Sequence, residues 1–228
     1  MYLEEMVRLW PETVAEARIV ATSHLARYEA ARSSVQGKSI CDIACGAGYG
    51  SRFLAQWAKS VVGMDISDSA IDWANKHFQS DNLFFHCADG SKTWPVQQQF
   101  DVITSFETLE HVSEPESFLR QLDKHLSLHG KLFMSVPNGP RDKKKTDNPY
   151  HLHHFDVKDF ENLVGDFFDD PQYYSQVYRK NWKHYAAKMQ RKLGLVKNQK
   201  YFLENYHMAK GLDLECKTWF VVARKRIR

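Results

Sequence analysis

Residues 39–50, which read SICDIACGAGYG, decide the fold of this chain. The first part is rich in strand-forming residues and contains the acid Asp42, and Gly46 and Gly48 then form a turn. An amphipathic segment near 49–58 follows at once, so the order is strand, glycine-rich turn and helix. Glycine lets a backbone approach a ligand closely, and a helix N-terminus offers free N–H groups. The stretch therefore predicts the opening of a nucleotide-binding βαβ unit.

The glycine spacing and the acids that follow narrow the choice of nucleotide. A dinucleotide fingerprint needs G-x-G-x-x-G, and here Gly50 is out of register with that pattern. A second strand near 60–65 ends in Asp65, which can accept hydrogen bonds from ribose hydroxyls. A third strand near 82–87 is followed by Asp89, which could accept from an adenine amino group. The ends of successive strands thus predict an acidic binding rim.

With these residues the chain resembles the class I S-adenosylmethionine (SAM) dependent methyltransferases. The resemblance is good over roughly residues 24–136 and looser over 150–224. In that family the glycine loop holds the methionine end of SAM, the acid after the second strand holds the ribose, and an A-D-G-like segment meets the adenine. The resemblance implies SAM as cofactor, and the expected cofactor-binding residues are Tyr28, Asp42, Gly46, Ala47, Gly48, Asp65, Ile66, Asp89, Gly90 and Phe106.

Strand and helix patterns alternate along the chain and predict an α/β fold. We expect a Rossmann-like, seven-stranded, mostly parallel sheet flanked by helices. The whole chain, 1–228, is expected to form a single domain with an N-terminal helical cap at 1–36 and a basic helical insert at 179–212 before the last strand. The expected strands lie near 39–43, 60–65, 82–87, 100–106, 130–136, 172–178 and 216–224, and the expected helices after the first turn lie near 49–58, 67–78, 116–127 and 156–168.

Composition excludes several classes of protein. Apolar and charged fractions are ordinary for a globular chain, and the formal net charge is only +3. No apolar run approaches the length of a membrane span, and the first residues lack the charge pattern of a signal peptide. The four cysteines show no Cys-x-x-Cys spacing and are interpreted as reduced thiols. We expect a cytoplasmic protein.

A cluster of acids and histidines follows the fourth strand. Glu107, Glu110 and His111 would share one face of a helical turn, and two carboxylates with an imidazole can bind a divalent cation. The loop at 151–154 could fold over the same pocket and supply a further ligand or a base. Alternatively, the acids cap a helix or touch the cofactor without a metal. The expected catalytic residues are His111, His153 and His154, and the expected metal ligands are Glu107, Glu110, His111 and His154.

Three finer resemblances bear on the methyl acceptor. Glu107, Glu110 and His111 are similar to a Glu-x-x-Glu-His segment of the ubiquinone-pathway O-methyltransferases. The small-RNA 3′-end 2′-O-methyltransferases share that segment and add a later histidine motif, which His153 or His154 matches approximately. Segments 24–28 and 136–151 resemble a bacterial group that is associated with surface-polysaccharide and natural-product biosynthesis; in that group the N-terminal helix packs over the cofactor, which makes Tyr28 a candidate contact.

The segment 179–200 is basic and contains no Asp or Glu, and aromatic and aliphatic residues interleave with its cations. It is interpreted either as a solvated helix with a core face, or as a basic lid for an anionic or lipid-linked acceptor. Nucleic acid is a third interpretation, since bases can stack on aromatic side chains beside cations.

The sequence favours a SAM-dependent O-methyltransferase whose acceptor is a sugar hydroxyl in glycan or glycolipid biosynthesis. The alternatives are a small aromatic or natural-product metabolite and the 2′-hydroxyl of RNA. A SAM-binding partner subunit without catalysis is least favoured, because the glycine loop and the pocket acids are intact. The sequence does not indicate an oligomeric state.

Overall fold

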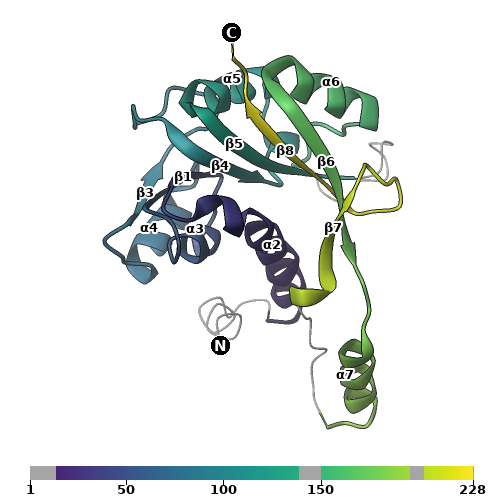
Figure 1. The fold of residues 1–228 in the computed structure, drawn as a ribbon. Coiled ribbons are helices and arrows are strands. Elements are labelled where there is room, and N and C mark those ends of the chain that lie inside the picture. Colours follow the sequence, from purple (N-terminus) through teal and green to yellow (C-terminus); the bar gives the residue numbers. More distant parts are fainter. Residues whose placement is uncertain (1–13, 139–149, 196–202, 228) are drawn as a thin grey trace.

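The computed structural model describes residues 14–138, 150–195 and 203–227. It has one eight-stranded sheet with the strand order β3-β2-β1-β4-β5-β8-β6-β7 (Figure 1). The first five strands in that order are parallel to one another, β8 is antiparallel to both β5 and β6, and β7 is antiparallel to β6. The strands are β1 (Ser39–Ile43), β2 (Ser60–Asp65), β3 (Leu83–Cys87), β4 (Phe100–Phe106), β5 (Leu126–Pro137), β6 (Phe168–Tyr178), β7 (Tyr206–Lys210) and β8 (Thr218–Lys225).

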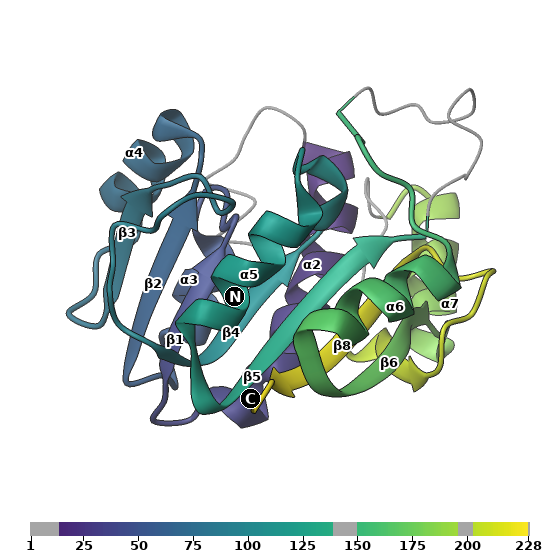
Figure 2. The same cartoon turned by 90° about the horizontal axis from the view of Figure 1, so that it is seen from above.

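Helices cover both faces of the sheet, as the view from above shows (Figure 2). One face carries α2, α3 and α4, and the other carries α5 and α6. A further helix, α7, stands away from the body of the molecule (Figure 1). The helices are α2 (Val14–Val35), α3 (Tyr49–Leu54), α4 (Asp68–His77), α5 (Pro115–His125), α6 (Val157–Phe167) and α7 (Trp182–Lys192), with short 3₁₀ turns η2 (Leu109–His111) and η4 (Leu203–Asn205).

Local chemistry explains where these elements begin. Ser67 caps α4 by accepting a hydrogen bond from the Ala70 N–H, as expected for a serine in front of a helix. Asp156 does the same for α6 through the Asp159 N–H, and Pro115 stands at the first position of α5. In β1 the residues after Ser39 are all buried, which is the pattern of a central parallel strand covered on both faces.

Two hydrophobic clusters form the core, one on each side of the sheet. The cluster between the sheet and α5 and α6 contains Phe118 and Phe160, and the cluster on the opposite face contains Leu25 of α2 and Phe53 of α3. Among the described residues, no helix has the length and apolar character needed to cross a membrane.

The α/β Rossmann-like class is confirmed, but the sheet has eight strands instead of the seven expected. The additional strand is β7, which lies inside the segment 179–212 that we expected to be helical. Of the described residues in that segment, only α7 and η4 are helical, because residues 206–210 pair with β6 and extend the sheet at its edge. The helical cap is present as α2, while the part of it at 1–13 lies outside the described residues.

Candidate active site

A cavity of about 450 Å³ opens at the carboxyl ends of the parallel strands. In a doubly wound sheet, ligands bind beyond these ends where the strand order reverses, here between β1 and β4. The lining combines residues that follow β1, β2, β3 and β4, and we call it the strand-end cavity. Four of the expected cofactor-binding residues line it, namely Asp65, Ile66, Asp89 and Gly90.

The glycine loop is tied to this cavity through Asp65. One carboxylate oxygen of Asp65 accepts the Gly46 N–H at 2.8 Å, and the other accepts the Ser67 N–H at 2.9 Å. Gly46 has a φ of 54°, and a Cβ at this position would meet nothing within 4 Å, so its space is open to a ligand. Gly48 also has a positive φ, but its missing Cβ makes room for the Phe85 ring. Ala47 is buried and does not line the cavity.

Asp42 is placed differently from our expectation. Its carboxylate is buried and accepts hydrogen bonds from the hydroxyls of Ser51 at 2.6 Å, Thr104 at 2.7 Å and Tyr28 at 3.2 Å. Burial raises the pKa of Asp42 to about 6, although these hydrogen bonds oppose the shift. The side chain therefore points into the protein beneath the loop and does not line the strand-end cavity.

Tyr28 and Phe106 also lie beneath the loop. The Tyr28 ring meets the Phe106 ring edge-on, with 4.9 Å between the ring centroids, and both residues belong to the core cluster under α2. A Cβ on Gly50 would lie 1.9 Å from the Tyr28 ring, so glycine is what allows α3 to approach α2 this closely. Neither Tyr28 nor Phe106 lines the cavity, so this placement does not support the expected contact with the cofactor.

Glu107 and Glu110 do not share a face, contrary to the expected helical turn. Glu107 has a φ of 54°, outside helical geometry, and only Leu109–His111 form a 3₁₀ turn. The Glu107 carboxylate accepts the Ser135 hydroxyl at 2.9 Å and lines the strand-end cavity. Glu107 is thus at the cavity wall, whereas Glu110 turns away into the protein.

Arg27 contacts Glu107 at the cavity wall, although it was not among the expected site residues. It lies in the segment 24–28. Its guanidinium is buried and donates to Gln176 at 3.0 Å and to Thr218 at 3.3 Å, and a third nitrogen lies 3.6 Å from the Glu107 carboxylate. The Glu107 carboxylate at the cavity wall thus compensates the buried positive charge of the Arg27 guanidinium. The signal available in the sequence was an arginine inside an otherwise apolar helix face, beside Leu25 and Ala26.

Three neighbouring side chains form a candidate cation site, the cation trio of Glu110, His111 and His151, and of these only His111 lines the strand-end cavity. One ligand atom from each lies within 4.8 Å of the others. The His111 Nδ1 is 2.9 Å from the Tyr150 carbonyl oxygen, which can only accept, so Nδ1 carries the proton and Nε2 keeps its lone pair. That Nε2 lies 3.7 Å from the Glu110 carboxylate. A backbone carbonyl bound to the second ring nitrogen is the usual arrangement behind a metal-binding histidine.

The electrostatics of the trio reflect its burial. Both Glu110 carboxylate oxygens are buried and have no hydrogen-bond partner among the described residues. Burial, followed by the charge of Glu107, raises the pKa of Glu110 to about 8. Burial, with the neighbouring His111 and His154, lowers the pKa of His151. The unpartnered carboxylate of Glu110 and the two imidazoles form a donor set that fits a divalent cation.

His153 and His154 are not part of the trio. They line a second cavity of about 380 Å³ together with Asp159 and Asp166 near α6. The cause is local: the N–H groups of Leu152 and His153 both donate to the Glu110 carbonyl, at 2.8 and 3.1 Å. These bonds hold the loop so that His151 meets His111. Among the described residues, the group that could hold a cation thus contains His151 and does not include the expected ligands His154 and Glu107.

Comparison with known proteins identifies the family to which the chain belongs. The sequence profile of the family described as "Methyltransferase domain" matches residues 15–188, which is more than half of the chain. The chain belongs to this methyltransferase family. The expected membership of the SAM-dependent methyltransferases is thereby confirmed at the level of family and fold.

Curated relatives are O-methyltransferases of ubiquinone biosynthesis. The chain is 34% identical over 114 residues to the "Ubiquinone biosynthesis O-methyltransferase" of Coxiella burnetii, a match that covers 49% of each chain. It is 30% identical over 148 residues to the mitochondrial enzyme of that name in Schizosaccharomyces pombe, covering 59% of this chain and 53% of the relative. The chain thus matches only about half the length of these curated relatives.

Solved structures show the same fold at low sequence identity. A SAM-dependent methyltransferase from Thermotoga maritima superposes with a TM-score of 0.65 at 15% identity, covering 92% of this chain and 95% of the other. An S-adenosylmethionine dependent methyltransferase from Mesorhizobium loti gives a TM-score of 0.60 at 19% identity, covering 87% of this chain and 97% of the other.

Proposed function

We propose that the chain is a SAM-dependent O-methyltransferase whose acceptor is a hydroxyl group of a small metabolite. The observation that carries the proposal is the position of His111, which belongs to the cation trio and also lines the strand-end cavity. A cofactor site and a group that can act on a hydroxyl thus adjoin in one place.

The residues of the strand-end cavity fit SAM. Asp65 and Asp89 supply carboxylate acceptors for the ribose and adenine, and Ile66 supplies an exposed apolar surface between them. The open space at Gly46 fits the methionine part, whose approach a side chain would obstruct. When bound, SAM supplies an electrophilic methyl group. The task of the chain is to align an acceptor oxygen with that methyl and to exclude water.

Methyl transfer to a hydroxyl also requires removal of the acceptor proton, and the cation trio suits this step. A divalent cation held by Glu110, His111 and His151 would act as a Lewis acid and lower the pKa of a hydroxyl bound near it. Without a cation, the His111 Nε2 is the imidazole nitrogen in the cavity wall that we propose as proton acceptor, because its Nδ1–H is fixed on the Tyr150 carbonyl. Both roles place the acceptor hydroxyl beside His111.

The names of the relatives favour a small aromatic acceptor over the sugar hydroxyl that the sequence analysis preferred. The curated matches are ubiquinone biosynthesis O-methyltransferases, and their similarity covers about half of this chain. An acceptor with two neighbouring hydroxyls suits the cation trio best, because both oxygens can reach one cation. We therefore propose a catechol-like metabolite, with the sugar hydroxyl and the RNA 2′-hydroxyl as the alternatives.

Methyl transfer from labelled SAM to a panel of acceptors tests this function. A catechol should accept the label in preference to a monophenol, a sugar nucleotide and an RNA oligonucleotide. Transfer to the sugar nucleotide or the RNA alone would restore one of the alternatives. A chain that binds SAM and methylates nothing in the panel would contradict the catechol assignment.

The cation trio is tested by a matched pair of histidine variants. His151→Ala should lower methyl transfer by roughly a hundredfold, because it removes a ligand or a base from beside the acceptor. His129→Ala is the matched control and should have little effect, since His129 is an exposed histidine of β5 outside the trio. Chelator should act like His151→Ala while SAM binding persists, and Mn²⁺ should bind the wild type but not His151→Ala in calorimetry. Equal losses in both variants with full activity in chelator would refute the trio.

A further inference from the structure

Helix α7 has its apolar side on the outside. Trp182, Tyr185, Met189 and Leu193 are spaced by three and four residues, so they share one face, and we call them the apolar stripe. Trp182 is 75% exposed, Met189 62% and Leu193 65%. A surface helix of a folded domain normally turns this side toward the core. Here the large apolar side chains face away from it.

The opposite side of α7 is the buried one, and specific contacts hold it in place. His184 and Ala187 are buried. The His184 Nδ1 lies 3.1 Å from the Tyr178 hydroxyl at the end of β6, and its N–H donates to the Asn181 side chain at 3.1 Å. Asn181 is bonded in turn to Asn205 beside β7. These contacts fix the rotation of the helix, so exposure of the apolar stripe is a property of the fold.

Cations flank the apolar stripe. Lys188 and Lys192 lie one turn apart and are exposed, and neither forms an ion pair with a described residue. Lys183 lies on the other flank and pairs with Glu204 at 2.9 Å. No Asp or Glu occurs between residues 179 and 200. The helix thus presents large apolar side chains with positive charge along their borders.

We propose that α7 lies on the surface of an anionic lipid bilayer and inserts its apolar stripe among the acyl chains. Helices that lie in the membrane interface typically have these two features, an apolar face that contains tryptophan and lysines that contact the lipid headgroups. Nucleic acid fits less well, because Met189 and Leu193 offer no ring on which a base could stack. Charge complementarity and the aliphatic part of the stripe together select the bilayer.

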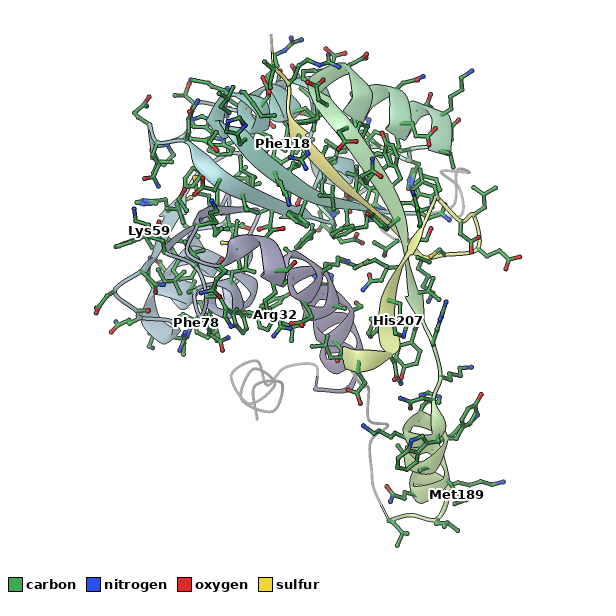
Figure 3. All side chains as sticks on the ribbon, in the orientation of Figure 1. Arg32, Lys59, Phe78, Phe118, Met189 and His207 are labelled. Atoms are coloured by element: carbon green, nitrogen blue, oxygen red, sulfur yellow. The ribbon has the colours of Figure 1, made fainter. Side chains whose placement is uncertain are left out.

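The position of α7 suits this role. It projects beyond the sheet and the other helices, and Met189 on it lies far from the labelled residues of the body (Figure 3). None of the residues from 179 to 195 lines the strand-end cavity, so α7 is not a lid over the site as described. The inference does not rest on the proposed function, so vesicle binding and methyl transfer can fail separately.

Co-sedimentation with lipid vesicles tests the proposal. The full chain should pellet with vesicles of phosphatidylcholine mixed with phosphatidylglycerol, and much less with phosphatidylcholine alone. The paired change Lys188→Gln and Lys192→Gln should lower partitioning onto the anionic vesicles by roughly tenfold or more. The matched control is Lys59→Gln with Lys76→Gln, which removes two exposed lysines elsewhere and should lower it far less.

The apolar stripe is tested in the same assay. Met189→Ser with Leu193→Ser should reduce vesicle binding at least as strongly as loss of the lysines, because it removes the inserted surface. Leu128→Ser with Leu214→Ser is the matched control, since both leucines are exposed outside α7. Unchanged thermal unfolding would show that the variants are folded. Absence of wild-type binding to anionic vesicles, or equal binding by all four variants, would overturn the proposal, as would capture of an RNA oligonucleotide in place of vesicles.

Discussion

Asp42 carries a carboxylate that solvent does not reach, and three hydroxyl groups surround it. Burial raises the pKa of this carboxyl from 3.8 to about 6. Between those values the folded state keeps the proton while the unfolded chain has already released it. The contribution of Asp42 to stability is therefore fully present below pH 3.8 and is lost as the pH rises through about 6.

The variant Asp42→Asn isolates this effect because an amide does not titrate. A pKa change of this size corresponds to about 2–3 kcal/mol between the two ends of the window. Relative to wild type, the Asn variant should gain about that much in free energy of unfolding between pH 3.5 and pH 7, measured by urea denaturation. A stability difference that is the same at both pH values would show that Asp42 is not the buried, shifted group described here.

The sequence predicts some of the site residues well and others poorly, for a geometric reason. Asp65 is the last residue of β2 and Asp89 follows β3, and parallel strands bring the residues at and after their carboxyl ends to one edge whatever their rotamers. Asp42 lies within a strand, so its direction depends on which hydroxyls from other elements surround it. His151 and His154 cannot be told apart from the sequence, because two hydrogen bonds to the Glu110 carbonyl orient the loop.

At the scale of elements, the contact between α2 and α3 sets the shape of the glycine loop. Gly50 permits the approach of the Tyr28 ring, and the Tyr28 hydroxyl in turn donates to Asp42 at the end of β1. The helix before the first strand is thereby locked to the loop that follows it. These two contacts join three elements, α3, α2 and β1, that the sequence presents only as separate patterns.

Gly50→Ala tests this contact. The added methyl would overlap the Tyr28 ring and should cost about 1–3 kcal/mol of unfolding free energy. The same change should cost much less in a Tyr28→Ala background, so the double-mutant cycle should be clearly non-additive. Gly165→Ala on α6 is the control: nothing lies within 4 Å of its Cβ position, so it should stabilise by up to about 1 kcal/mol. Additive effects at Gly50 and Tyr28 would contradict the contact.

Strand β7 marks the limit of prediction from sequence at this scale. It has only five residues and sits beyond a basic helical stretch, and it becomes a strand through pairing with β6. Pairing of this kind depends on a partner far away in the sequence and not on local periodicity. Strands β1, β2 and β4 were predictable because a turn and a helix with its own signals follow each of them.

At the scale of the whole molecule, two hydrophobic clusters hold helices on either face of one sheet, and the reversal of strand order leaves the strand-end cavity between them. Helix α7 stands outside this arrangement (Figure 1). The chemistry at the cavity and the surface at α7 therefore belong to separate parts of the fold. The proposed activity requires that the strand-end cavity bind SAM.

Titration calorimetry of SAM into the full chain tests this requirement most directly. We predict that SAM binds with a dissociation constant of micromolar order, which is about 8 kcal/mol of binding free energy. Ile66→Ala should weaken binding because it removes apolar surface from the cavity wall, while Leu128→Ala, an exposed leucine elsewhere, should leave it unchanged. Binding of a nicotinamide dinucleotide with no binding of SAM would contradict the central claim.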